Sequence, residues 1–192
     1  MAAATTSTTS AAEPTAEQDV YELRQYVIEK EEQRKGLDVF LKEAAIPAVN
    51  RLGIKPVGVF YPSEGLSPVY VLLRHPSMAS VATLGRRLAE DSDFLSKGAD
   101  YLDATAAAPA FKRVESSIMV AFAGMLHIER PVQNPGRVFQ LRTYESHGER
   151  AALKKIEMFN EGGEIALFDR LGLRSVFFGQ TLAGRRQPNL MY

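Results

Sequence analysis

The sequence predicts an α+β fold in which two ferredoxin-like units follow each other along the chain. The first observation is an internal repeat, because Val20–Tyr26 reads VYELRQY and Val138–Tyr144 reads VFQLRTY. The second is the pattern after each copy, where alternating hydrophobicity gives way to helical spacing and then returns. In the first unit the predicted order is β-α-β-β-α-β, the split arrangement of ferredoxin-like domains.

Four parts are predicted along the chain of 192 residues. They are a disordered leader, a first unit, a linker and a second unit, spanning residues 1–19, 20–125, 126–137 and 138–192. The leader is mainly Ala, Thr and Ser, so it cannot bury enough surface to fold, and the linker is rich in Pro, Asn and Gly. We expect the second unit to be truncated after its third strand and the chain to be a fragment, because the missing fourth strand would leave an open sheet edge.

The first strand has two different faces. Tyr21 and Leu23 alternate with Glu22, Arg24 and Tyr26, as in a strand with one apolar side and one polar side. We expect the Tyr21 face to pack against the helices and the Arg24 face to be covered by a second sheet.

Hydrophobic spacing also predicts the other elements. The first helix should end at Gly53 and be kinked or split at Pro47. In the second unit, Ser146 and Glu149 match a capping box, and the helix that follows should approach its sheet more closely or bend at Gly162-Gly163. The predicted strands are 20–28, 54–61, 69–73, 114–122, 138–144, 173–178 and 189–192, and the predicted helices are 37–52, 77–88, 92–102 and 153–171.

Composition and missing motifs limit the function classes. The formal net charge is zero, which argues against a nucleic-acid-binding protein, and no apolar run is long enough for a transmembrane segment. There are no cysteines, no phosphate-binding glycine motif and no nucleophile elbow. His75, His127 and His147 lack the spacing of metal ligands, so we expect no metal and no cofactor. For localisation we expect the cytoplasm by default, or export if residues 1–19 follow a removed signal peptide.

The repeated motifs resemble those of the NIPSNAP family. They are Glu22–Tyr26 with Arg51-Leu52-Gly53, and Leu141–Tyr144 with Arg170-Leu171-Gly172, while Gln140 departs from the pattern by replacing the acid. The resemblance implies a dimeric α/β-barrel fold, built as a pseudo-dimer within one chain or as a homodimer, with the helices outside. Relatives in that superfamily include cofactor-free monooxygenases, isomerases and haem-binding enzymes that use the space between sheet and helices. The family itself has no settled reaction.

The candidate ligand-binding residues are Arg24, Tyr26, Arg142, Tyr144, Glu22 and Glu115. Arg can hold a carboxylate, phenolate or carbonyl as a fixed cation, and Tyr can donate a hydrogen bond. The competing interpretation is a polar network between the sheets, with arginine paired to Glu22 or Glu115, and we favour it because most buried polar groups are structural. The pairs Lys154-Lys155 and Arg185-Arg186 are expected on the solvated surface.

Two functions follow from these candidates. We favour a small-molecule-binding or interaction module built on an α/β barrel. The alternative is a cofactor-independent enzyme, similar to a monooxygenase or isomerase, that acts on a small aromatic or carbonyl compound with Arg24 and Tyr26 as the polar pair. A cavity of roughly a few hundred Å³ touching Arg24 or Arg142 would favour the enzyme, whereas a filled barrel with ion-paired arginines would favour the module.

Overall fold

The computed structural model describes residues 18–132, 134 and 136–192, so the predicted leader lies outside the described residues as far as residue 17. The strands are β1 (Val20–Val27), β2 (Val57–Phe60), β3 (Val69–His75), β4 (Arg113–Ala121), β5 (Thr143–Glu145), β6 (Gly179–Ala183) and β7 (Asn189–Met191). The helices are α1 (Glu31–Phe40), the π-helical turn η1 (Leu41–Ala45), α2 (Ile46–Arg51), α3 (Met78–Ala89), α4 (Ser92–Leu102), α5 (Glu149–Asn160) and α6 (Glu164–Arg170).

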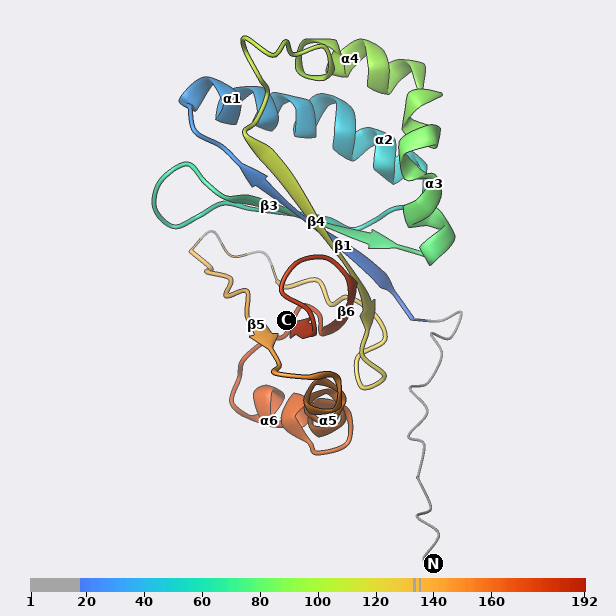
Figure 1. Ribbon diagram of the computed structural model, residues 1–192, viewed down its shortest axis with the longest axis vertical. Coiled ribbons are helices and arrows are strands. Elements are labelled where there is room, and N and C mark those ends of the chain that lie inside the picture. The colour runs from blue at the N-terminus through green and yellow to red at the C-terminus, as the bar shows by residue number, and fades with distance from the viewer. Residues whose placement is uncertain (1–17, 133, 135) are drawn as a thin grey trace, which may run out of the picture.

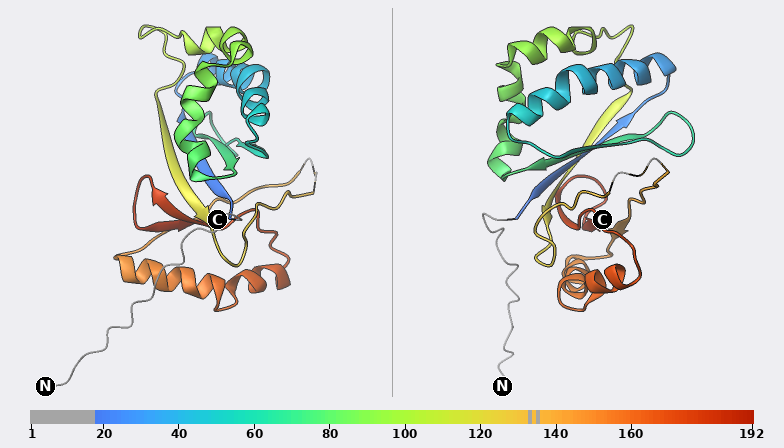
Figure 2. Two further views of the ribbon diagram at one scale, coloured as in Figure 1. Left: turned by 90° about the vertical axis from the view of Figure 1, so that its right-hand side faces the viewer. Right: turned by 180° about the vertical axis from the view of Figure 1, so that it is seen from behind.

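In the described part of the chain, one antiparallel sheet of seven strands curls into a half-barrel (Figure 1). Helices α1–α4 lie on the outer side of the first unit, and α5 and α6 lie on the outer side of the second (Figure 1, Figure 2). The concave face of the sheet lies between these two helical layers. The predicted α+β class is therefore confirmed.

The strand order explains how the two units meet. The sheet runs β2-β3-β1-β4-β6-β7-β5, and its first four strands have the ferredoxin-like order. Strand β1 is central in its unit, because it pairs with β3 on one side and β4 on the other. Antiparallel pairing of β4 with β6 places Met119 opposite Thr181 and joins the units into one sheet. Strand β5 lies at the end of the sheet.

The first helical segment begins at Glu31 and is divided into α1, η1 and α2. Pro47 lies in the first turn of α2 and has no N–H to donate. The chain accommodates this with a π turn just before it, in which the Ile46 N–H bonds to the Leu41 carbonyl. The helix predicted to be kinked or split at Pro47 is thus split there, by a local change of helical winding.

The strands of the second unit differ from the prediction. Residues 173–178 do not form a strand, because β4 ends at Ala121 opposite Gly179 and leaves no ladder partner for them. Of the predicted strand 138–144, only the end joins the sheet as β5, whose partner β7 has three residues. A short partner therefore limits the repeated strand in this unit.

The predicted capping box was wrong, and the predicted glycine bend is confirmed. Helix α5 begins at Glu149 with Gly148 as its N-cap, while the Ser146 N–H bonds to the Pro188 carbonyl at 2.9 Å. That bond holds Ser146 beside the chain leading into β7, out of capping position. Helices α5 and α6 are separated at Gly163, whose φ of 82° is a left-handed conformation that favours glycine.

The two faces of β1 are the reverse of the prediction. Tyr26 belongs to the core beneath the first helical layer, whereas Tyr21 and Leu23 pack on the concave face with Met119 and Phe177. The helices find their apolar partners mainly on β3, which contributes Val69, Val71 and Leu73 to the same core. A third core, beneath α5 and α6, contains Phe122, Phe159, Phe178 and Leu190. Both faces of β1 are therefore buried against apolar layers.

Asp19 was assigned to the leader, but it is part of the fold. Its side chain is 1% exposed, and its carboxylate accepts from Arg74 at 2.6 Å and from the Ile128 N–H at 2.9 Å. Burial by itself would raise the pKa of Asp19, but the hydrogen bond from Arg74 and those from Ile128 and His127 lower it. The residue fastens the start of the predicted linker to β3.

Candidate functional site

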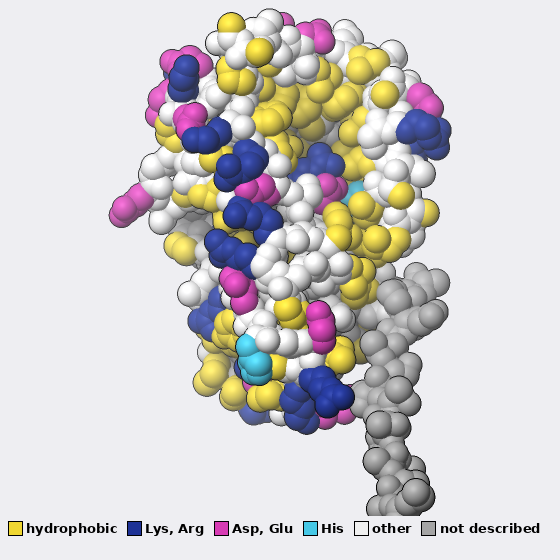
Figure 3. Space-filling model, in the orientation of Figure 1, with side chains coloured by type: hydrophobic (Ala, Val, Ile, Leu, Met, Phe, Trp, Pro, Cys, Tyr) yellow, Lys and Arg dark blue, Asp and Glu magenta, His cyan; other side chains and the backbone are white. Residues whose placement is uncertain are grey.

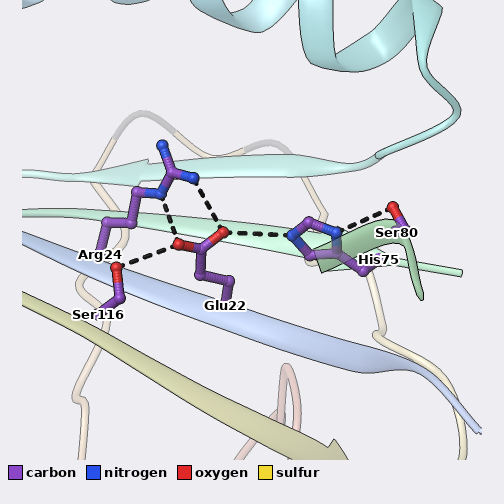
Figure 4. Close-up of polar contacts among 5 residues, drawn as sticks. All are labelled: Glu22, Arg24, His75, Ser80 and Ser116. Carbon is purple, nitrogen blue, oxygen red and sulfur yellow. Dashed lines mark hydrogen bonds and ion pairs between the residues drawn. The ribbon is translucent and has the colours of Figure 1, made fainter. Parts of the chain in front are cut away.

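Polar side chains from three neighbouring strands meet beneath the first helical layer. Glu22 and Arg24 are two residues apart on β1, so they point to the same face of the sheet. Strand β3 brings His75 to one side of them, and β4 brings Ser116, which lies opposite Arg24 in the register. Ser80, in the first turn of α3, completes the group shown in Figure 4. We call these five residues the Glu22 network.

The carboxylate of Glu22 is the centre of this network. It accepts from Arg24 Nε at 2.7 Å and Nη2 at 3.0 Å, a bidentate pair, and from the Ser116 hydroxyl at 3.1 Å. His75 Nε2 lies 3.4 Å from the same carboxylate, although its geometry does not meet that of a hydrogen bond. His75 Nδ1 lies 3.1 Å from the Ser80 hydroxyl. A proton on Nε2 would face the carboxylate and leave Nδ1 to accept from Ser80.

The network keeps Glu22 ionised. Burial by itself would raise the pKa of this carboxyl, but His75 and the hydrogen bonds and charge of Arg24 lower it to about 2. Burial also opposes the charge on Arg24, and the paired Glu22 carboxylate outweighs it and raises the pKa of the guanidinium. At neutral pH the pair is therefore a buried ion pair with no net charge.

An apolar pocket lies above Arg24, between the sheet and the helices. It has a volume of about 50 Å³ and is lined by Arg24, Tyr26, Phe40, Leu41, Ala45, Ile46, Val49, Val57, Val71, Leu73, Leu88 and Phe94. Figure 3 shows the hollow in the helical layer, with hydrophobic side chains on its walls and charged side chains at its base. The third nitrogen of Arg24, Nη1, points away from Glu22 (Figure 4). The pocket thus combines apolar walls with one cationic donor.

Arg142 and Tyr144 form a separate group in the second unit. Arg142 donates from Nε and Nη2 to Gln140 Oε1 at 3.1 and 2.9 Å, the same arrangement that Arg24 makes with Glu22. The Tyr192 hydroxyl donates to the Tyr144 hydroxyl at 2.7 Å, and this bond lowers the pKa of Tyr144. Tyr144 packs with the core beneath α5 and α6. The structure does not bring this pair together with Arg24 and Tyr26.

Glu115 lies in a third place, on the concave face of the sheet. It is paired with Arg113 and Arg185, and the hydrogen bond from Arg185 lowers the pKa of its carboxyl. Arg24 is paired with Glu22 and not with Glu115. The six predicted residues therefore divide among three sites, of which the Glu22 network is the most buried.

Sequence reasoning missed the role of His75, Ser80 and Ser116. His75 is fully buried, and Ser80 is 6% exposed. Alternation along β3 places His75 on the same face as Leu73, which was a usable signal for the histidine. For the two serines there was no such signal, because their role depends on strand register and on where α3 begins.

Two further features of the described residues bear on function. None of the helices there is long and apolar enough to cross a membrane. The same part of the chain contains no group of three or more His, Asp or Glu side chains arranged to hold a metal ion.

Comparison with known proteins points to one family. The NIPSNAP family model matches residues 21–123, just over half of the chain. A comparison with curated proteins gave no match.

Solved structures of three bacterial proteins are similar to the chain. A NIPSNAP family protein from Agrobacterium tumefaciens strain C58 is 18% identical over 55% of this chain and 88% of its own, with a TM-score of 0.44. A second from that strain, described as having unknown function, is 21% identical over 54% of this chain and 88% of its own, with a TM-score of 0.42. An uncharacterized NIPSNAP domain protein from Burkholderia xenovorans is 18% identical over 54% of this chain and 95% of its own, also with a TM-score of 0.42.

Proposed function

The chain belongs to the NIPSNAP family, and we propose its function from the site itself. The protein is a binding module for a small apolar molecule that carries one carbonyl oxygen. The observation that carries this proposal is Arg24, the charged side chain in the lining of an otherwise largely hydrophobic pocket. Such pockets bind through apolar contact, and a few polar groups orient the ligand.

A carbonyl suits the charge of the pocket better than a carboxylate does. Glu22 already neutralises Arg24 through two hydrogen bonds, so a second anion would have to compete with a buried carboxylate. Nη1 of Arg24 points away from Glu22 (Figure 4) and can donate to a neutral oxygen without disturbing the ion pair. The hydrophobic remainder of the ligand would lie among Phe40, Ile46 and Leu88.

The protonation of the network supports binding more than catalysis. A general base works best when its pKa is near the operating pH, whereas the pKa of Glu22 is held at about 2. His75 is fully buried and is absent from the described lining of the pocket. We therefore do not assign the alternative, a cofactor-independent enzyme.

The size of the pocket limits the ligand. A volume of about 50 Å³ is well below the roughly 300 Å³ at which drug-sized sites begin. We expect a ligand with a short carbon chain and a dissociation constant of about 1 mM, since so few atoms supply only about 4 kcal/mol.

The proposal can be tested with acetone as the probe, because a volume of about 50 Å³ holds only about four non-hydrogen atoms. Titration of isotope-labelled protein, followed by NMR, should give saturable amide shifts around Arg24 and η1. Ala45 lines the pocket, so Ala45→Leu should fill it and abolish these shifts. Ala82→Leu is the matched control, because Ala82 is an exposed residue of α3 outside the lining, and it should bind like the wild type.

Two results would contradict the proposal. The first is equal affinity of wild type and Ala45→Leu for acetone, which would place the probe elsewhere. The second is tighter binding of acetate than of acetone at this pocket, which would show that Arg24 recognises an anion and that the argument from charge is wrong.

A further inference from the structure

A second pocket lies on the concave face of the sheet, on the other side of β1 from Arg24. Its volume is about 180 Å³, and it is lined mainly by polar side chains. Gln25, Tyr70, Ser117 and Thr143 line it from four strands, and Arg185 and Arg186 line it from the turn between β6 and β7. We call it the concave-face pocket. It is independent of the proposed carbonyl site, because successive residues of β1 point to opposite faces.

The turn that carries the two arginines is held in place by a buried side chain. Asn189 is 3% exposed, and its Nδ2 donates to the carbonyls of Arg185 and Arg186, both at 2.9 Å. Its Oδ1 accepts from the Thr181 hydroxyl at 2.6 Å. The hydrogen bonds of the Asn189 amide thus hold the backbone of the two arginines and attach the amide to β6. The hairpin formed by β6 and β7 is the red one in Figure 2.

Two backbone features of the turn also point to a position under constraint. Arg186 has a φ of 58°, and among the described residues no other non-glycine residue has a positive φ. A Cβ on Gly184 would lie 2.7 Å from the Ser117 hydroxyl oxygen and 3.0 Å from Ser117 Cα, so this turn packs directly against β4. Strained backbone of this kind persists where the surroundings determine it, and it is a reason to look for function.

The arginine side chains at the concave-face pocket outnumber the carboxylates. Glu115, whose side chain is 14% exposed, is shared by Arg113 and Arg185. Arg186 is 64% exposed and lies 3.6 Å from Glu145, a contact too long and too exposed to neutralise it effectively. Three arginines thus face two carboxylates. Because its ion pair with Glu145 is long and exposed, Arg186 is the arginine that can turn toward a ligand.

We propose that the concave-face pocket binds a small organic anion, with the guanidinium of Arg186 pairing with its carboxylate or phosphate group. Arginine holds such groups through two parallel hydrogen bonds. The hydroxyl groups of Tyr70, Ser117 and Thr143 and the amide of Gln25 would bind further polar atoms of the ligand. Arg185–Arg186, expected from the sequence to be ordinary solvated surface, is in this proposal a binding element.

The test uses succinate and inorganic phosphate as separate probes, each followed by NMR amide shifts at constant ionic strength. We expect saturable shifts at Gly184, Arg186 and Ser117 with at least one probe, and the tighter of the two identifies the anionic group. Arg186→Gly should weaken that binding by about tenfold or more, because it removes the guanidinium. Glycine also accepts the left-handed backbone, so the variant should fold at least as stably as the wild type.

Arg86→Ala is the matched control, because Arg86 is 67% exposed and paired only with Glu90 among the described contacts. It should bind both probes like the wild type, and Arg186→Gly should still bind acetone at the other pocket. Equal anion affinity of Arg186→Gly and wild type would overturn the proposal. So would the absence of saturable shifts at the turn with either probe, or shifts that appear only around Arg24.

Discussion

Replacing Glu22 with Gln tests how much the buried ion pair stabilises the fold. The substitution keeps the shape of the side chain and an oxygen that accepts from Arg24, as Gln140 does for Arg142 in the second unit. It removes the charge and replaces one acceptor oxygen with a donor NH2 group. The pKa of Glu22 falls from an ordinary 4.5 to about 2 in the folded protein. At about 1.4 kcal/mol for each tenfold change, this corresponds to about 3 kcal/mol of stability at neutral pH.

The sign of the pH dependence follows from the lowered pKa. Glu22 stabilises the fold fully above pH 4.5, where the carboxyl is ionised in both folded and unfolded chains, and this stabilisation is lost as the pH falls toward 2. The difference between wild type and Glu22→Gln should therefore decrease from about 3 kcal/mol at pH 7 to about 1.4 kcal/mol at pH 3. Urea unfolding of both proteins at the two pH values measures this directly.

Gln140→Glu provides the matched control. Gln140 is exposed and has the same relation to Arg142, so the new ion pair should change stability by less than about 1 kcal/mol. The reasoning would be refuted if Glu22→Gln lost less than about 1 kcal/mol at pH 7, or if its loss were the same at pH 3 as at pH 7. Either result would mean that burial opposes the charge of Glu22 as strongly as Arg24 and His75 favour it.

Four further substitutions test other parts of the fold, each by urea unfolding. Asp19→Ala removes a buried partner of Arg74 and should cost about 3 kcal/mol; a loss below about 1 kcal/mol would show that this residue does not fasten the linker. Gly163→Ala should destabilise by about 1 kcal/mol because φ is 82°, whereas Gly36→Ala, in α1 with open space around its Cβ, should stabilise by about 0.5–1 kcal/mol; equal effects would contradict the backbone argument. Phe159→Ala, 1% exposed, should cost about 3–5 kcal/mol, and a small loss would mean that the second-unit core contributes little.

Comparison of the two units shows how the candidate residues of the repeated motif should be weighed. The two arginines of the repeated motif make the same contact with the residue two positions earlier, Glu22 in one unit and Gln140 in the other. This shared contact indicates that the motif supports a local side-chain arrangement in each unit. Of the two pairs, Glu22 and Arg24 carry opposite charges and border a pocket. It is therefore in the first unit that we place the carbonyl-binding site.

The domain boundaries stay predictions, as do the alternatives of a pseudo-dimer within one chain or a homodimer and the expectation that the chain is a fragment. The same is true of localisation. The start of the linker region is attached to the residues just before β1, since the backbone N–H of Ile128 donates to the Asp19 carboxylate. A boundary experiment should therefore keep Asp19 and residues 126–128 together.

Periodicity determined the elements and their order in the first unit. Alternation along β1, helical spacing up to Gly53 and the order of strands depend on local hydrophobic pattern, which is written in consecutive residues. The faces of β1 could not be assigned in this way. A period of two separates Tyr21 from Glu22, but it does not say which face meets the helices, because both faces of this strand are buried.

Long-range pairing decided the functional features. His75 reaches Glu22 only because β3 pairs with β1, and Arg185 reaches Glu115 from 70 positions away along the chain. Sheet register, the position of a turn and the burial of an ion pair depend on contacts between segments distant in sequence. The sequence by itself therefore determined the repeated strand and its family, whereas only the tertiary structure placed an ion-paired arginine under the helices and a cationic turn over the concave face.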